Sequence, residues 1–170
     1  TTAKAGTSGV SGMIHLSTGA STNGRSGAVM ITTGQGVQDA SGDILLAVGS
    51  GNTGAGGDIS LTAGESTASD SFGGRILLTS GSSTTKTSGS VLIKSANAGT
   101  AGESGDISLS TGTSSSGSSG SIFLGTGTAA GDASGDISII VGSGDTGAGG
   151  DVAVTAGVTT ANNAAGGKVT

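Results

Sequence analysis

Aspartate is the residue whose placement in this chain comes closest to chemistry. Two pairs stand fifteen residues apart, Asp43 with Asp58 and Asp136 with Asp151. Carboxylate oxygens are preferred calcium ligands, so a ladder of these four side chains makes calcium the one cofactor to consider. The competing interpretation is that each carboxylate caps a tight turn as an Asx-type hydrogen-bond acceptor. We favour the cap.

Basic residues continue both series, because Arg75 follows the first pair in phase and Lys168 follows the second. A basic side chain there would offset the repulsion between stacked carboxylates. Residues 54–58, GAGGD, resemble the glycine–aspartate repeats of calcium-binding RTX proteins. The resemblance implies calcium binding, but those repeats have a period of nine and denser ligands. The period of fifteen favours the turn cap.

Two other patterns suggest chemistry. Residues 49–54 and 142–147 match GxGxxG, but a dinucleotide site needs a helix directly after that loop. No helical periodicity follows either copy, and 37 glycines in 170 residues produce the pattern by chance. The single histidine, His15, has no distinctive serine and carboxylate beside it, as a hydrolytic triad requires. We predict no enzyme, no catalytic residue and no cofactor-binding residue.

The composition excludes further classes. Six lysine and arginine residues are scattered and aromatic residues make up 1%, so we expect no nucleic-acid partner, which needs basic patches and stacking platforms. No stretch approaches about eighteen apolar residues, so we expect no membrane span. The absence of cysteine removes disulfides and thiolate metal sites.

A short tandem repeat must position all of these residues. Each copy reads approximately Ser/Gly-Gly-x-Ile-x-Leu-x-Thr-Gly, followed by about six small or polar residues. The second residue of the unit, here called the marker glycine, is Gly12, Gly27, Gly42, Gly57, Gly74, Gly89, Gly105, Gly120, Gly135, Gly150 and Gly167. The spacings are 15, 15, 15, 17, 15, 16, 15, 15, 15 and 17. A short constant period predicts that one small unit stacks on copies of itself.

The apolar residues keep a fixed phase in the repeat. With the marker glycine as position two, position four is Ile14, Val29, Ile44, Ile59, Ile76, Val91, Ile107, Ile122, Ile137, Val152 and Val169. Position six is Leu16, Ile31, Leu46, Leu61, Leu78, Ile93, Leu109, Leu124, Ile139 and Val154. Residues two apart share one face of a strand. We therefore predict an all-β fold, a flattened parallel β-solenoid of about eleven coils of about fifteen residues.

The same repeat predicts how each coil closes. Position nine is glycine in all complete repeats but one, which fits a turn that needs positive φ. Position eleven is always small, and we expect it to point inward against the isoleucine and leucine positions. The repeats of 16 and 17 residues should bulge at the last corner, near Phe72, Glu103 and Ala164, because loops absorb insertions cheaply.

The outward positions carry an interrupted apolar stripe. Position five includes Met30, Leu45, Leu77, Leu92 and Phe123, and position seven includes Ile140. Outward residues of a solvated strand are normally polar, and contiguous apolar patches mark contact surfaces. The alternative is that position five points into a wider core. We favour contact between copies, which makes these six residues the predicted assembly stripe.

The chain as a whole resembles short-coil β-solenoid repeat proteins of the structural and adhesin-array type. That resemblance implies a structural or adhesive rod of a large extracellular or cell-surface protein. Copies would assemble side by side or end to end into a filament or surface layer. Residues 1–170 would form one repeat array and a fragment of a longer repetitive protein. Ser41 to Gly64 is repeated 93 residues later, which indicates duplication of a six-repeat block.

The opposite wall carries threonine and serine and is similar to the flat face of β-solenoid ice-binding proteins. That resemblance implies an alternative function, ice binding, with an ice surface as the partner. The alternative ice face consists of Thr22, Thr67, Thr84, Thr113, Thr128 and Thr160. Residues such as Gln35 and Asn97 interrupt the row.

Overall fold

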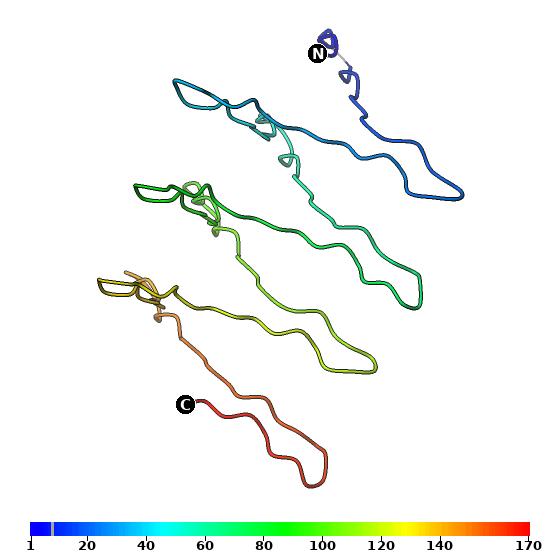
Figure 1. Cartoon of the computed structure of the whole chain (residues 1–170). Coiled ribbons are helices and arrows are strands. Elements are labelled where there is room, and N and C mark those ends of the chain that lie inside the picture. The colour runs from blue at the N-terminus through cyan, green and yellow to red at the C-terminus, as the bar shows by residue number, and fades with distance from the viewer. Residues whose placement is uncertain (8) are drawn as a thin grey trace. The chain divides into compact units, whose positions relative to one another are not determined.

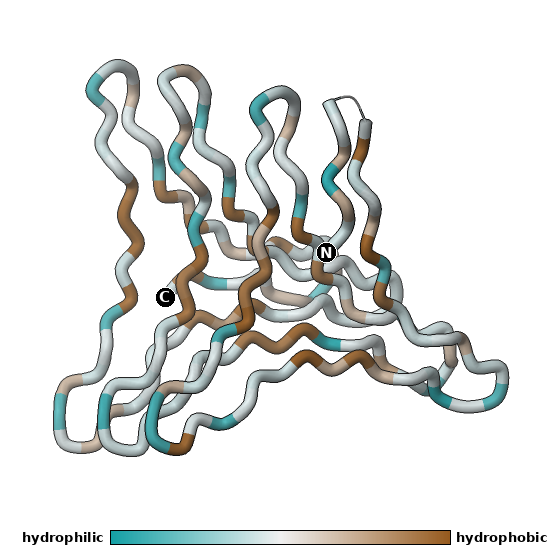
Figure 2. Tube along the Cα trace, turned by 90° about the horizontal axis from the view of Figure 1, so that it is seen from above, coloured by the Kyte–Doolittle hydropathy of each residue, from teal (hydrophilic) through white to brown (hydrophobic). Residues whose placement is uncertain are grey.

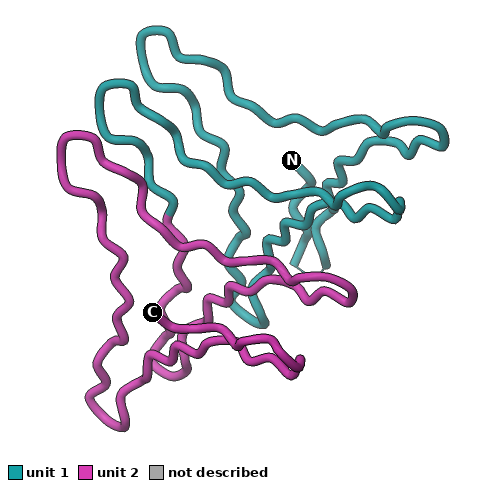
Figure 3. Tube along the Cα trace, turned by 60° about the horizontal axis from the view of Figure 1, so that its bottom comes forward, with its two compact units in different colours: residues 1–91 teal, residues 92–170 magenta. Residues whose placement is uncertain are grey.

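Nearly straight runs of chain alternate with tight loops throughout this protein (Figure 1). The computed structural model describes residues 1–7 and 9–170, among which there is no helix and no strand. The chain divides into two compact units, Thr1–Val91 and Leu92–Thr170 (Figure 3). An extended run covers positions two to eight of a repeat. A closing loop joins position eight to the next marker glycine.

The marker glycine closes each loop by packing on the position-eight side chain of the preceding repeat. A Cβ built on Gly57 would lie 3.0 Å from Val48 Cγ1, and one built on Gly150 would lie 3.0 Å from Val141 Cγ1. These distances are shorter than ordinary van der Waals contact, so a side chain at position two would push the loop open. Loop closure therefore requires glycine at 57 and 150, whereas at Gly42, Gly105 and Gly135 the nearest atom to an added Cβ lies at 3.8 Å, an ordinary contact.

Backbone hydrogen bonds close three of the loops. Gly74 N donates to Gly64 O at 2.8 Å, Gly167 N donates to Gly157 O at 2.8 Å, and Gly89 N donates to Gly81 O at 2.9 Å. The first two loops belong to 17-residue repeats and the third to a 15-residue repeat. The two additional residues thus lie inside the closing loops. Phe72 and Ala164, near which the sequence predicts the insertions, lie in these two loops.

Hydroxyl groups at position eleven order the loop interior. Ser83 Oγ accepts a hydrogen bond from Lys86 N at 2.9 Å, and Thr159 Oγ1 accepts one from Ala161 N at 3.1 Å. Ser66 Oγ accepts from Ala68 N in the same way, at 3.4 Å. These are local side-chain caps of a turn. The prediction that position eleven points inward against the isoleucine and leucine positions is wrong at these three sites, because the hydroxyls bond within their own loop.

Positive φ occurs near the end of several loops and not at their start, at six glycines and at Asn163, whose φ is 63°. Five of the six glycines with positive φ stand three residues before a marker glycine: Gly9, Gly24, Gly54, Gly102 and Gly147. The sixth, Gly131, stands four residues before one. No described glycine at position nine has positive φ, so the turn predicted there is wrong. The left-handed residue is needed where the loop turns back toward the next run, and glycine adopts that conformation without steric cost.

The predicted flattened parallel β-solenoid is wrong, and so are the terms β-solenoid and β-helix for this chain. The only backbone–backbone hydrogen bonds between described residues are the three that close loops. A stack of coils would instead carry a hydrogen-bonded ladder between repeats. Each fifteen-residue unit ends in a hairpin-like bend, so the following run leaves in a new direction and does not lie on the run before it.

Successive runs of one unit return to the same direction after three repeats. In Thr1–Val91, the closing loops over residues 18–27 and 63–74 lie at one corner of the path, and those over 33–42 and 80–89 lie at another (Figure 1). In Leu92–Thr170 taken by itself, the loops over 111–120 and 156–167 share a corner in the same way. Each unit therefore follows a three-sided path with one repeat per side.

This path leaves the chain almost fully exposed to solvent. No described side chain is buried, and the accessible surface is 16820 Å². A compact monomer of 15.5 kDa would expose about 7,200 Å², and a fully extended chain about 22,500 Å². The single chain thus keeps about three quarters of its extended-chain surface. Its apolar residues concentrate on the runs, and hydrophilic residues concentrate in the loops (Figure 2).

The closure contact predicts different effects for two glycine substitutions in one closing loop. Gly150→Ala should lower stability by about 1–3 kcal/mol, because its Cβ would crowd Val141. Gly142→Ala is the matched control, since nothing lies within 4 Å of its added Cβ and its φ is not positive. It should be neutral or raise stability by about 0.4–1 kcal/mol, by restricting the unfolded chain. Thermal unfolding midpoints measure both; equal shifts would contradict the closure contact.

The loop cap gives a second prediction. Ser83→Ala removes the acceptor for Lys86 N and Thr85 N and should cost about 0.5–1.5 kcal/mol. Ser82→Ala, one residue earlier, removes a hydroxyl with no such role and should cost less than about 0.5 kcal/mol. Amide chemical shifts at Lys86 report the lost bond directly. An unchanged Lys86 resonance in the Ser83 variant would refute the cap.

Candidate assembly surface

The exposure of side chains alternates along each run with a period of two. Ile44 at position four is 51% exposed, Leu45 at position five is 86% exposed, and Leu46 at position six is 65% exposed. Ile122, Phe123 and Leu124 follow the same order. Alternation of this kind places successive side chains on opposite sides of an extended backbone. Positions four and six therefore share one side of the run, and position five lies on the other.

The predicted assembly stripe lies on the more exposed side of the runs. Its members are 75% to 92% exposed: Met30, Leu45 and Leu77 in Thr1–Val91, and Leu92, Phe123 and Ile140 in Leu92–Thr170. When such exposed apolar side chains contact another molecule, burial stabilises the contact by about 25 cal/mol for each Å² removed from water.

Phe123 has a local support that the sequence pattern did not reveal. A Cβ built on Gly125 would meet the Phe123 ring atoms Cε1 and Cζ at 2.8 Å. The ring therefore lies over the glycine, along its own run. Gly125 is the only glycine at position seven, and it stands beside the only aromatic residue of the stripe. Glycine at 125 leaves room for the ring, because a Cβ there would collide with its Cε1 and Cζ atoms.

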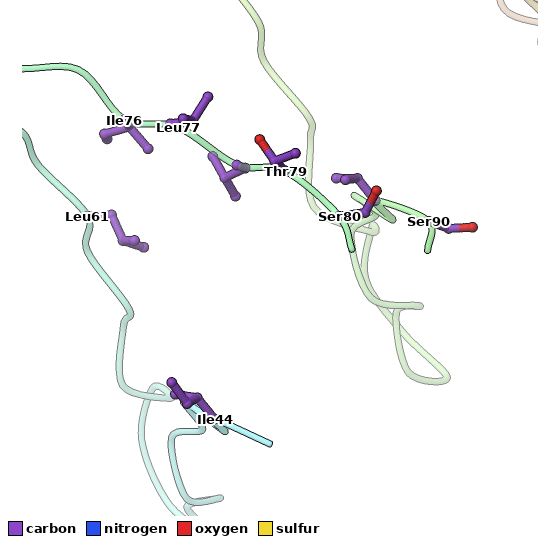
Figure 4. A pocket seen from close by; sticks show the side chains of 9 residues that line it. Ile44, Leu61, Ile76, Leu77, Thr79, Ser80 and Ser90 are labelled. Carbon is purple, nitrogen blue, oxygen red and sulfur yellow. The ribbon is translucent and has the colours of Figure 1, made fainter. Parts of the chain in front are cut away.

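The less exposed side of the runs borders an open apolar hollow in Thr1–Val91. The hollow has a volume of about 740 Å³, and Ile44, Leu61, Ile76, Leu78 and Val91 contribute side chains from positions four and six. Figure 4 shows Ile44, Leu61 and Ile76 facing this space from three different runs. Positions four and six of successive repeats are thus turned toward one space, but no atoms of this chain fill it.

The threonines of the alternative ice face all lie in closing loops. Thr22, Thr67 and Thr84 are exposed in the first unit, and Thr113, Thr128 and Thr160 are exposed in the second. In Thr1–Val91, the loops over 18–27 and 63–74, which contain Thr22 and Thr67, share a corner of the path, and the loop over 80–89, which contains Thr84, lies at another (Figure 1). These residues occupy bends and do not form a row along a strand.

The side chains considered as metal ligands or catalytic groups are also exposed to solvent. Among residues 1–7 and 9–170, no three His, Cys, Asp or Glu side chains gather where a metal ion could be held. The carboxylates that cap backbone amides are Asp39, which accepts from Ala40 N at 2.7 Å, and Asp132, which accepts from Ala133 N at 2.7 Å. Both stand in closing loops, whereas Asp43, Asp58, Asp136 and Asp151 stand on the extended runs. His15 is exposed on the same side of its run as the stripe positions.

Loop geometry accounts for the two GxGxxG matches. Their last glycines, Gly54 and Gly147, have φ of 93° and 106°. Each match is therefore a closing loop with its left-handed glycine, and no helix follows either one in the described chain. None of the described residues forms a helix with the length and hydrophobicity to cross a bilayer. Comparison with protein-family models, curated proteins and solved structures finds no match.

Proposed function

We propose that this chain is a structural or adhesive rod segment of a large repetitive protein at the cell surface or outside the cell. Copies of the chain would assemble into a filament or surface layer. The observation that carries the proposal is the complete exposure of a regularly spaced apolar set, with no side chain buried in the single chain. Soluble monomers rarely expose large contiguous apolar surface, so this surface needs a partner.

The charge and spacing of the repeat support copies of the chain as that partner. Charged residues make up 10% of the chain and the net charge is −5, so repulsion between copies is weak. Every repeat presents the same apolar phase over 170 residues, and the partner that matches this period throughout is the repeat itself. The outward stripe then provides lateral contacts between assembled rods.

Electron microscopy of the purified chain tests the assembly role. We expect filaments or bundles of constant width. Isolated globular particles would contradict the proposal. If those particles also separate the freezing and melting points of ice at millimolar protein, the ice-binding alternative takes its place.

The two phenylalanines provide a matched test of the stripe. Phe123 lies on the stripe and is 92% exposed, whereas Phe72 lies in a closing loop and is 97% exposed. Phe123→Ser should weaken lateral bundling by about 1.5–3 kcal/mol for each contact, the burial free energy of the ring. Phe72→Ser should leave bundling unchanged. Turbidity and filament width report the difference, and equal effects of the two substitutions would exclude the stripe as the lateral contact.

A further inference from the structure

We propose that three copies of this chain interleave about a common axis, so that each extended run pairs with runs of the other two copies as a parallel β-strand. The inference rests on the proposed assembly role. It specifies the partner, the number of copies and the way in which they pair. The partner surface is the backbone edge of the runs together with the apolar hollow, not the outward stripe.

Unpaired backbone groups along the runs are the first argument. Folded proteins form about one intramolecular hydrogen bond per residue, two thirds of them between backbone groups. The described residues of this chain form three backbone–backbone hydrogen bonds, and all three close loops. The runs are nearly straight (Figure 1) and carry isoleucine, valine and leucine at alternate positions. An extended apolar run with both edges free is a template for another strand.

The three-sided path determines the number of copies. Each unit places successive repeats on three sides and returns to the first side at the fourth repeat (Figure 3). A second copy of a unit, rotated by 120° about the axis of that unit's path, has its runs on the same three sides, at heights between those of the first. A third copy, rotated by 240°, completes every side. A twofold rotation cannot superpose three sides, so the closed symmetry is threefold.

Rotation also decides which residues meet. On each side, the run of repeat n in one copy neighbours the run of repeat n+1 in the next copy, and all runs point the same way. Residues at the same repeat position then lie above one another on neighbouring strands, as the repeat pattern indicates, but neighbouring strands belong to different chains. This arrangement differs from the stacking of coils within one chain, which the structure contradicts.

Side chains on the runs fit this register. Position four and six residues of three copies would fill the hollow that Ile44, Leu61 and Ile76 border in one copy. At position three, Asp58 of one copy would stand between Asp43 and Arg75 of the other two, and Asp151 between Asp136 and Lys168. The basic side chain would offset the repulsion between the two carboxylates. Opposite charges on neighbouring strands stabilise a sheet.

The available area is sufficient for an obligate assembly. The single chain exposes 16820 Å², about 9,600 Å² more than a compact chain of its mass. Obligate interfaces bury about 2,000–5,000 Å² or more in total. Interleaving is the arrangement that covers both edges of every run at once, so it accounts for an excess of this size.

Paired cysteines test the register in a chain that has no cysteine of its own. Ala47, Thr62 and Thr79 occupy position seven of three consecutive repeats. In the trimer, residue 47 of one copy neighbours residue 62 of the next at about one strand spacing, 4.8 Å, within disulfide reach. Oxidation of Ala47→Cys/Thr62→Cys should therefore link three chains covalently, and nonreducing gels should show a band at three times the chain mass.

The control is Ala47→Cys/Thr79→Cys, whose residues would stand two strand spacings apart, about 9.6 Å, beyond disulfide reach. It should remain uncrosslinked under the same oxidation. Links confined to single chains in the first variant, or equal crosslinking of both variants, would overturn the proposal.

Sedimentation equilibrium of the unmodified chain measures the number of copies in the assembly without any substitution. We expect three times 15.5 kDa or whole multiples of that trimer, and a mass of one or two chains would overturn the proposal. Micrographs separate this outcome from the rod function. Trimers without filaments would support the interleaved trimer and refute the rod function. Filaments whose Ala47→Cys/Thr62→Cys chains do not crosslink would support the rod function and refute the interleaved trimer.

Discussion

Backbone hydrogen bonding is the constraint on which the rest of this structure depends. An N–H or C=O group that leaves water must find a partner, and the extended runs of this chain offer almost none to one another. A single copy can therefore keep its runs extended only in water, with every apolar side chain exposed. In the proposed trimer, the runs of other copies would supply both the hydrogen-bond partners of the backbone and the cover for the side chains.

The repeat divides its residues between two tasks. The closing loop is specified locally, by a marker glycine against position eight, by hydroxyl caps such as Ser83, and by a left-handed glycine such as Gly54. These features need no second chain. The run carries apolar residues on one side and the stripe on the other, and under the proposed assembly both would become buried and contribute to association. Loop substitutions should thus perturb the loop itself, whereas substitutions on the runs should perturb association.

Much of the local structure could be predicted from the sequence, but the path of the chain could not. The period of fifteen, the insertion sites near Phe72 and Ala164, and the two-residue alternation at positions four, five and six are all present in the structure. The stacked coils are absent, because a period of fifteen describes one full coil and one side of a three-sided path equally well. The direction in which a chain leaves a loop depends on a few backbone angles, and composition does not encode them.

Two signals in the sequence could have improved the prediction. Glycine stands three residues before six of the marker glycines, and five of these six glycines, for example Gly24 and Gly54, have positive φ. The left-handed residue therefore belongs at this position and not at position nine. The block that repeats after 93 residues contains six repeats, which is two full circuits of a three-sided path. Repeat position alone predicts the stripe and the alternative ice face. Repeat position does not show that the threonines lie in bends.

Amide hydrogen exchange of the native material tests most directly whether the runs are paired between chains. The account predicts slow exchange for backbone amides along positions two to eight in every interior repeat, in addition to the loop-closing amides of Gly74, Gly89 and Gly167. Protection confined to those three amides, with free exchange along the runs, would show that the runs remain unpaired and would contradict the account.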